Sequence, residues 1–212
     1  VNILKKDKKN FKIELATTNK NYKRLINQIK LFNIKNVIVT DKKSFLTIKK
    51  ILKNKKINIY NDFNSLTKIL SNKKIDYTMS AISGFEGLKP TLDLIKFTKV
   101  IAIANKESII CGWSLIKKKL IKFNTKFIPI DSEHFSIWSL LNNSIVSNVE
   151  KVFITASGGP FLNYPLNKFK LIKTKEALKH PSWSMGKKIS IDSSTMMNKV
   201  FEVIEAKKIF NL

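Results

Sequence analysis

Short apolar runs rich in β-branched residues alternate with segments of helical spacing through the first half of this chain. The runs occupy residues 11–17, 36–41, 78–83 and 99–106. Between them, apolar residues recur every three to four positions over residues 21–32, 43–53 and 87–96. Strands and helices in alternation predict a parallel sheet with helices on both faces, which is the doubly wound α/β fold.

Polar and small residues lie at or just beyond the carboxyl ends of the expected strands. Because doubly wound sheets bind nucleotides at that edge, we expect a cofactor there. The candidate cofactor-binding residues are Asn21, Ala81, Ile82, Ser83, Asn105 and Glu107. The chain lacks the Gly-rich turn with which a dinucleotide-binding fold normally begins.

The formal net charge of +25 by itself favours a nucleic-acid-binding protein. However, Arg24 is the one arginine among 40 basic residues, although arginine supplies the bidentate phosphate and base contacts of such proteins. The lysines are also spread along the chain and form no single stripe. We therefore expect no nucleic-acid partner, and a basic nucleic-acid-binding protein stays as the alternative from another class.

Membrane and disulfide signals are absent from the sequence. No apolar run approaches the ~20 residues that span a bilayer, so we expect no membrane partner. Cys111 is the single cysteine, which fits a reducing compartment, and its apolar surroundings predict that it is buried.

The run from His180 to Glu205, HPSWSMGKKISIDSSTMMNKVFEVIE, carries side chains suited to a phosphorylated substrate and a cation. If residues 195–210 are helical, Asn198, Lys199, Glu202 and Glu205 share one side of the helix. The opposite side is expected to be a core face made by Met196, Val200, Val203, Ile204 and Phe210. Asp192, Ser193 and Ser194 are expected just before the helix, where they would cap its free amides and favour an anion.

Three carboxylates are candidates for one metal site. Asp131 and Glu133 are two residues apart, so in an extended segment they would point the same way, and Glu202 can complete the set. Mg²⁺ and Mn²⁺ prefer such oxygen ligands, whereas zinc spacing of Cys and His is absent. Taken alone, an Asp-x-Glu pair is more often a solvated surface pair.

Five segments in order resemble a known enzyme family. They are AISGFEGLKPTLDLI from Ala81, ANKESIICG from Ala104, PIDSEHFSIWSLL from Pro129, ITASGGPF from Ile154 and HPSWSMGKKISIDSSTMMNK from His180. Together with FKIELATTNKN from Phe11, they make nearly the whole chain similar to the 1-deoxy-D-xylulose 5-phosphate reductoisomerase family.

This resemblance implies a reaction and its cofactors. It implies rearrangement and reduction of 1-deoxy-D-xylulose 5-phosphate to 2-C-methyl-D-erythritol 4-phosphate in isoprenoid precursor biosynthesis. NADPH would be the reductant, and Mg²⁺ or Mn²⁺, or else Co²⁺, would be the metal. It further implies a homodimer in the cytoplasm of a bacterium or in a plastid-type organelle.

The resemblance also implies roles for individual residues. The implied catalytic residues are Lys106, Asp131, Glu133, His180 and Glu202. Substrate would also contact Ser132, Ser157, Trp183, Ser193, Asn198 and Lys199, of which Ser157, Ser193, Asn198 and Lys199 match the phosphate-binding positions. Met185 and Gly186 match positions near the nicotinamide.

The expected organisation is a Rossmann-like NADPH-binding domain over residues 1–130, followed by part of an α+β catalytic domain over residues 131–212. A helix is expected from Asp131, and a strand over residues 152–158 should enter a Gly-Gly-Pro turn. A lid is expected around residues 157–187. Since family members have a Gly-rich loop before the first matched segment and continue past the last one, we expect both ends of the chain to be cut. A catalytically inactive relative is the remaining alternative.

Overall fold

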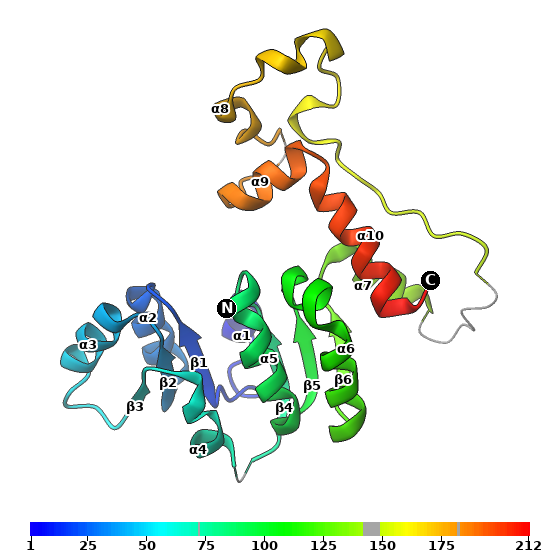
Figure 1. Cartoon of the computed structure of the whole chain (residues 1–212). Coiled ribbons are helices and arrows are strands. Elements are labelled where there is room, and N and C mark those ends of the chain that lie inside the picture. The colour runs from blue at the N-terminus through cyan, green and yellow to red at the C-terminus, as the bar shows by residue number, and fades with distance from the viewer. Residues whose placement is uncertain (72, 142–148, 182) are drawn as a thin grey trace. The chain divides into compact units, whose positions relative to one another are not determined.

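The computed structural model describes residues 1–71, 73–141, 149–181 and 183–212 (Figure 1). The chain forms two compact units, Val1–Ile75 and Asp76–Leu212. This structural division falls before residue 130, where we expect the cofactor-binding function to give way to the catalytic one. That functional boundary stays a prediction.

The first unit is built on a parallel sheet with the strand order β1-β2-β3. Leu15 of β1 pairs with Asn36 of β2, which in turn pairs with Asn58 of β3. The core contains Leu25 and Ile29 from one helix and Ile48 from the next. Its elements are α1 (Asn2–Lys6), β1 (Leu15–Thr18), α2 (Tyr22–Phe32), β2 (Asn36–Val39), α3 (Lys42–Ile51), β3 (Asn58–Tyr60), η1 (Phe63–Ser65) and α4 (Leu66–Leu70).

The second unit contains another three-stranded sheet, with the order β4-β5-β6, and the helices that carry the candidate site. Val100 of β5 pairs in parallel with Lys126 of β6. Its strands and first helices are β4 (Ile75–Ser80), η2 (Phe85–Gly87), α5 (Leu88–Leu94), η3 (Ile95–Phe97), β5 (Thr98–Ile103), α6 (Lys106–Phe123), β6 (Lys126–Pro129) and α7 (Ser132–Leu141). The later elements are η5 (Gly159–Phe161), η6 (Leu166–Leu171), α8 (Thr174–Ala177), α9 (Lys187–Ser194) and α10 (Met197–Phe210).

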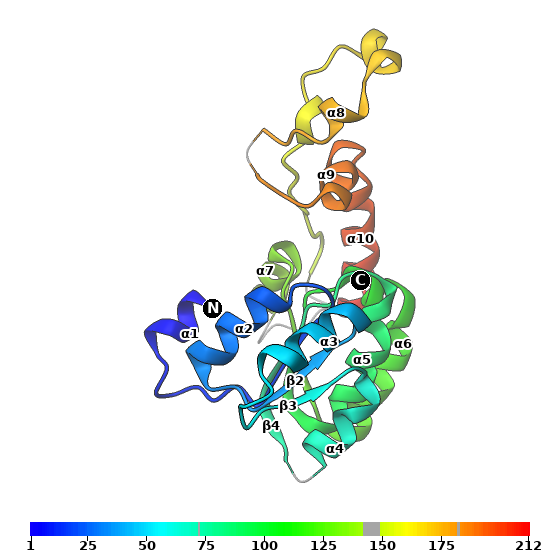
Figure 2. The same ribbon diagram turned by 90° about the vertical axis from the view of Figure 1, so that its left-hand side faces the viewer.

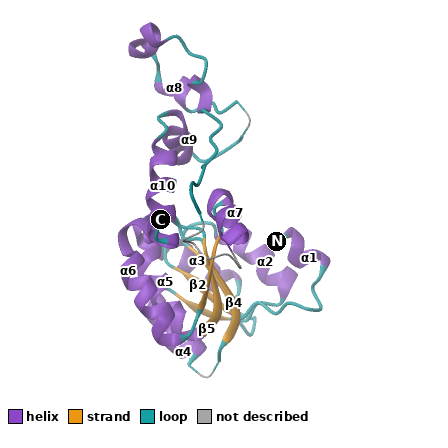
Figure 3. Cartoon of the chain, turned by 90° about the vertical axis from the view of Figure 1, so that its right-hand side faces the viewer, coloured by secondary structure: helices purple, strands orange, loops and turns teal. Residues whose placement is uncertain are grey.

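Helix α10 connects the sheet-bearing part of this unit to α9. It packs against α6 and α7 and contacts α9 at its other end (Figure 2). Figure 3 shows that helices and loops, without strands, make up the described chain after β6. None of the described helices combines the length and apolar character that crossing a membrane requires.

The structure confirms the predicted α/β fold of parallel strands alternating with helices. The strand predicted over residues 152–158 is wrong, because that segment has no regular structure and Phe153 is 86% exposed. A strand needs a neighbour for its backbone hydrogen bonds, and no neighbouring strand is seen for it among the described residues. Its Gly-Gly turn is present, with Gly158 and Gly159 both at positive φ. Cys111, expected to be buried, is exposed.

Candidate active site

A cavity of about 530 Å³ in the second unit collects most of the predicted site residues. It is lined from α6, α7, α9, α10 and the loops before and after η5. The predicted residues on its wall are Lys106, Asp131, Ser132, Glu133, Ser157, His180, Trp183, Met185, Ser193, Asn198, Lys199 and Glu202. The predicted residues that do not line it are Asn21, Ala81, Ile82, Ser83, Asn105, Glu107 and Gly186.

Three carboxylates that line this cavity lie close together. Asp131, Glu133 and Glu202 each offer an oxygen, and these oxygens lie within 4.8 Å of one another. The Asp131 carbonyl accepts the first hydrogen bond of α7 from Phe135 N at 2.8 Å, so Glu133 stands in the first turn of α7. Negative charge is favourable there because the helix dipole is positive at that end.

The reason given from sequence for this convergence is wrong. Asp131 and Glu133 were expected to point the same way from an extended segment, but Glu133 is helical. The faces of α10 are also the reverse of the prediction. Glu202 and Glu205 are buried, at 2% and 1% exposure, whereas Val200 and Val203 are 47% and 54% exposed.

Two lysines and an asparagine connect the carboxylates. Lys106, the first residue of α6, donates to Asn198 Oδ1, and Asn198 Nδ2 donates to Glu202 Oε1. Lys106 Nζ also lies 3.8 Å from Asp131 Oδ2. Lys199 Nζ lies 3.1 Å from Glu133 Oε1, forms an ion pair with Glu202 and donates to the Thr155 carbonyl. The two ammonium groups thus balance part of the carboxylate charge.

Burial and mutual repulsion separate the protonation states of the carboxylates. Burial raises the pKa of Asp131, and the neighbouring Glu133 and Glu202 raise it further against the pull of Lys106. Burial alone would also raise the pKa of Glu133, but hydrogen bonds from Asp131, Ser132 and Lys199 lower it below its usual value. A proton is therefore held at Asp131 more readily than at Glu133.

The donor set fits a hard divalent cation. Glu202 Oε2 is buried and forms an ion pair with Lys199, and its remaining lone pairs can bind a cation. Carboxylate oxygens from Asp131, Glu133 and Glu202 are the ligands that Mg²⁺ and Mn²⁺ prefer.

Hydroxyl and imidazole groups also line the cavity. Ser157 Oγ lies 3.2 Å from His180 Nε2, and His180 Nδ1 accepts a hydrogen bond from the Trp183 backbone at 3.1 Å. Trp183 is 66% exposed, and its place on a lid stays a prediction. Asp192, Ser193 and Ser194 were expected to cap the last helix, which is wrong. They form the last turn of α9, and the N-cap of α10 is Met196 without a side-chain hydrogen bond.

Residues missed from sequence complete the lining of the cavity, and Gly159 is the clearest case. A Cβ at Gly159 would lie 2.9 Å from the Ser193 carbonyl, so only glycine allows this approach. The Gly-Gly-Pro motif was the signal for it. Thr155 contributes its carbonyl to Lys199, and no feature of the sequence indicates that role. Ala156, Gly158, Ile189 and Met196 are the other lining residues that were not predicted.

The predicted cofactor residues of the second unit lie at the carboxyl edge of its sheet. Ala104 N donates to the Ser80 carbonyl at 2.8 Å, which joins the ends of β4 and β5. The Asn105 side chain donates to the Ile82 and Gly84 carbonyls and accepts from Ser108 N. Its polar atoms are thus used to hold the loop after β4, so any contact of this side chain with a cofactor would be indirect.

The remaining predicted cofactor residues are more accessible. Ala81 and Ser83 are exposed on the loop after β4, and Glu107 pairs with Lys188 at 3.0 Å. Gly186 is the N-cap of α9, next to Met185 on the cavity wall. In the first unit, the exposed Asn21 caps α2 by accepting from Arg24 N. An ordered loop beside the start of a long helix fits a dinucleotide at the edge of a sheet.

Comparison with known proteins identifies a family. The family model described as 1-deoxy-D-xylulose 5-phosphate reductoisomerase matches residues 1–112. The model for the C-terminal domain of the same family matches residues 127–210.

Individual relatives agree with the family models. The 1-deoxy-D-xylulose 5-phosphate reductoisomerase of Pelagibacter ubique (strain HTCC1062) is 70% identical over 99% of this chain and 54% of its own length. The protein of the same name from Wolbachia sp. subsp. Drosophila simulans (strain wRi) is 43% identical over 100% of this chain and 54% of its own length. The chain spans about half the length of the curated relatives it matches.

Solved structures show the same likeness. The Zymomonas mobilis reductoisomerase in complex with NADPH superposes with a TM-score of 0.88 at 32% identity, over 100% of this chain and 54% of its own. A reductoisomerase in complex with NADPH, fosmidomycin and magnesium gives 0.87 at 31% identity, over 99% of this chain and 54% of its own.

Proposed function

We infer the function from one premise, that the chain belongs to the 1-deoxy-D-xylulose 5-phosphate reductoisomerase family. We propose that it forms part of an NADPH- and divalent-metal-dependent enzyme that converts 1-deoxy-D-xylulose 5-phosphate to 2-C-methyl-D-erythritol 4-phosphate. The observation that carries this proposal is the convergence of Asp131, Glu133 and Glu202 in a cavity that Lys106 and Lys199 also line.

The carboxylates would hold the cation. Asp131, Glu133 and Glu202 would bind Mg²⁺ or Mn²⁺, which when bound acts as a Lewis acid on adjacent substrate oxygens. Ser132 lines the cavity with its Oγ 2.7 Å from Glu133 Oε2, so it can both orient that carboxylate and meet a substrate hydroxyl. Lys106 and Asn198 hold Glu202 in place through two consecutive hydrogen bonds.

The phosphate would lie between α9, α10 and the loop before η5. Ser157, Ser193, Asn198 and Lys199 all face the same cavity and supply neutral donors and one cation. Lys199 is paired with Glu133 and Glu202, so it would link the metal-binding carboxylates to the phosphate. Anchoring a remote phosphate keeps the reacting carbons in position, which lowers the barrier.

NADPH would bind at the carboxyl ends of parallel strands and supply a hydride to the rearranged aldehyde. Asn21, Ala81–Ser83 and Asn105–Glu107 are the proposed contacts there, with Met185 and Gly186 near the nicotinamide. Support comes from the solved relatives at 32% and 31% identity, which are complexes with NADPH. His180 and Trp183 would cover the substrate when residues 157–187 close, which would exclude water.

The test is a metal titration of the full-length enzyme, with NADPH oxidation as the measurement. Glu202→Ala should lower kcat by at least about 100-fold and raise the Mn²⁺ concentration needed, because an interaction made through the metal is lost. Asp93→Ala is the matched control, since Asp93 pairs with Lys89 on the surface of α5 and should stay within about twofold of wild type. Normal activity and metal dependence in Glu202→Ala would overturn the proposed metal site.

The homodimer and the location, in the cytoplasm of a bacterium or in a plastid-type organelle, are proposals as well. Sedimentation of the full-length enzyme at several concentrations tests the homodimer, and a monomer at all of these concentrations would contradict it.

Titration of the full-length enzyme with NADPH and NADH tests the cofactor, and equal affinity for both would contradict the choice of NADPH.

A further inference from the structure

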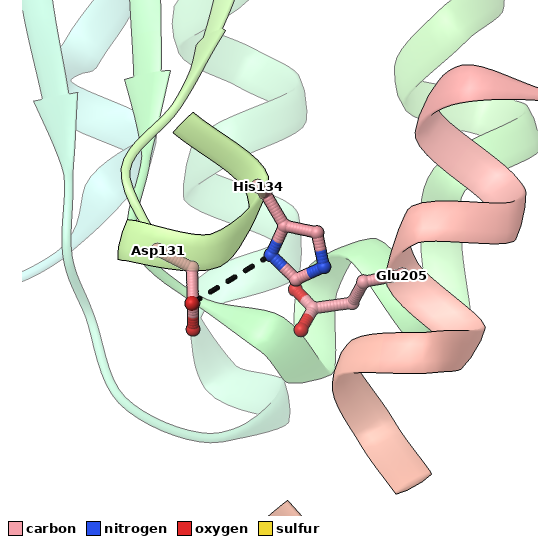
Figure 4. A group of neighbouring side chains, drawn as sticks. All are labelled: Asp131, His134 and Glu205. Carbon is pink, nitrogen blue, oxygen red and sulfur yellow. Dashed lines mark ion pairs between the residues drawn. The ribbon is translucent and has the colours of Figure 1, made fainter. Parts of the chain in front are cut away.

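A second group of ligand atoms lies beside the three carboxylates already described. Asp131, His134 and Glu205 each present one ligand atom, and these atoms lie within 4.8 Å of one another (Figure 4). His134 Nδ1 is 3.8 Å from Asp131 Oδ1. His134 and Glu205 are each 1% exposed, so neither side chain is solvated.

The hydrogen bonding of His134 determines which of its nitrogens faces this group. Its Nε2 lies 2.8 Å from the Glu202 backbone carbonyl. A carbonyl oxygen can only accept, so Nε2 must carry the proton that is donated. In a neutral imidazole, Nδ1 is then an acceptor, and it lies on the side of the Asp131 carboxylate.

Two atoms of this group are buried without a hydrogen bond to any described residue. They are His134 Nδ1 and Glu205 Oε2. Burying a polar atom without a hydrogen-bond partner is costly, so these two atoms indicate a ligand that the described residues do not supply.

We propose that Asp131, His134 and Glu205 form a second divalent-cation site, next to the site of Asp131, Glu133 and Glu202 and sharing Asp131 with it. A bound cation would satisfy both unpaired atoms at once. An imidazole nitrogen with two carboxylates suits Mn²⁺, Co²⁺ or Zn²⁺ better than Mg²⁺, which prefers oxygen ligands throughout. Asp131 would bridge two ions about 3.5–4 Å apart, as in other two-metal sites.

The second site depends on atoms that the proposed catalytic metal does not use. His134 and Glu205 belong to the second site alone, and Glu133 and Glu202 belong to the first. Variants can therefore remove either site while leaving most ligands of the other. Failure of the second site and failure of the proposed function give different results.

Manganese binding to the full-length protein, followed by electron paramagnetic resonance and metal counting, tests the proposal. Wild type should bind two Mn²⁺ per chain, and at saturation the two should show spin coupling through the shared carboxylate. His134→Gln and Glu205→Gln should each weaken the second binding step at least about tenfold and abolish the coupling. Asp93→Asn makes the same carboxyl-to-amide replacement at a surface position and should leave both steps unchanged.

The variant Glu133→Gln distinguishes the two sites, because Glu133 belongs to the first site only. It should weaken the all-oxygen step and leave nitrogen coordination of Mn²⁺ detectable by its hyperfine coupling. That coupling is measured in wild type too, so the proposal stays testable if a variant does not fold. One Mn²⁺ per chain in wild type without nitrogen coupling, or two binding steps that are unchanged in His134→Gln, would overturn the second site.

Discussion

Helices α3 and α10 bury opposite kinds of side chain. In α3, Ser44 and Ile48 are buried, the lysines are exposed, and Asp41 caps the first turn by accepting from Ser44 N at 2.8 Å. In α10, the buried residues are Glu202, Glu205 and Ala206, and the N-cap makes no side-chain hydrogen bond. Residues at the same helical spacing thus form an apolar core face in α3 and a buried face of carboxylates, which belongs to the candidate site, in α10.

The difference shows that the stability of the fold and the function of the site depend on different contributions to the free energy. Burying Ile48 removes apolar surface from water and contributes free energy directly. Burying carboxylates costs free energy unless cations and donors compensate, and Lys106, Lys199 and Asn198 provide part of that compensation. We therefore expect substitutions in α3 to change stability and substitutions on the buried face of α10 to change binding and pH dependence.

Ile48→Ala should have the largest effect on stability. Ile48 is fully buried, so truncation should cost about 2–5 kcal/mol of unfolding free energy through lost burial and a cavity. Leu46→Ala on the same helix is the control, because Leu46 is 50% exposed and should cost far less. Urea denaturation measures both variants. An equal loss of unfolding free energy in the two would contradict the difference between the buried and exposed faces of α3.

Glu205→Gln should stabilise the protein in a pH-dependent way. The pKa of Glu205 is raised to about 8 in the folded state from 4.5, so the folded chain keeps a proton that the unfolded chain releases. Wild-type stability should therefore fall as pH rises from 4.5 to 8, whereas glutamine cannot ionise. Each pKa unit corresponds to about 1.4 kcal/mol. The unfolding free energy of Glu205→Gln should therefore exceed that of wild type by a few kcal/mol near pH 8.

Thermal or urea unfolding at several pH values in the presence of a chelator measures this effect. The difference between Glu205→Gln and wild type should be small near pH 5 and largest near pH 8. A difference that is flat across this range would contradict a raised pKa for Glu205.

Lys199→Ala should weaken substrate binding with little loss of fold stability. A charge-assisted contact to phosphate contributes about 1.5–3 kcal/mol, so KM in the full-length enzyme should rise about 10- to 100-fold. Added Mn²⁺ should not restore it. Lys50→Ala on the exposed face of α3 is the matched control and should leave KM within about twofold. An unchanged KM in Lys199→Ala would show that this lysine serves the carboxylates alone.

Val203→Ser should have the smallest effect. Val203 is 54% exposed, so its replacement should change the unfolding free energy by no more than about 0.5 kcal/mol. Chemical denaturation of the 212-residue chain is the measurement. A cost comparable to that of Ile48→Ala would mean that the apolar side of α10 is a core face after all.

Much of the first unit could be predicted because its signals are local. The helix expected over residues 21–32 is α2, and Asn21 caps it as an Asn before an apolar period should. The strand expected over residues 36–41 contains β2, all but one of whose residues are buried. In these segments the hydrophobic period, the caps and the burial all agree.

The sequence predicts which residues belong to the candidate site, but it does not predict the local structure that brings them together. The chemistry and the motifs of Asp131, Glu133 and Glu202 predict a shared site, and these residues do converge. The extended geometry expected for the first two is wrong, and so is the capping role of Asp192, Ser193 and Ser194. The partnership of His134 with Glu205 left no pattern in the sequence, because it joins residues from two helices.

The sequence by itself determined the alternation of strands and helices, the helix of α10 and the chemical types at the site. Periodicity, caps and motifs act over a few residues, so they can be read without a fold. Only the tertiary structure decided which side of α10 is buried. Hydrophobic period predicts burial when apolar contact is the main gain. Helix α10 instead buries carboxylates where it packs against α6 and α7, and Lys106 of α6, which is distant in sequence, compensates part of their charge through Asn198. Such compensation exists only after the chain has folded.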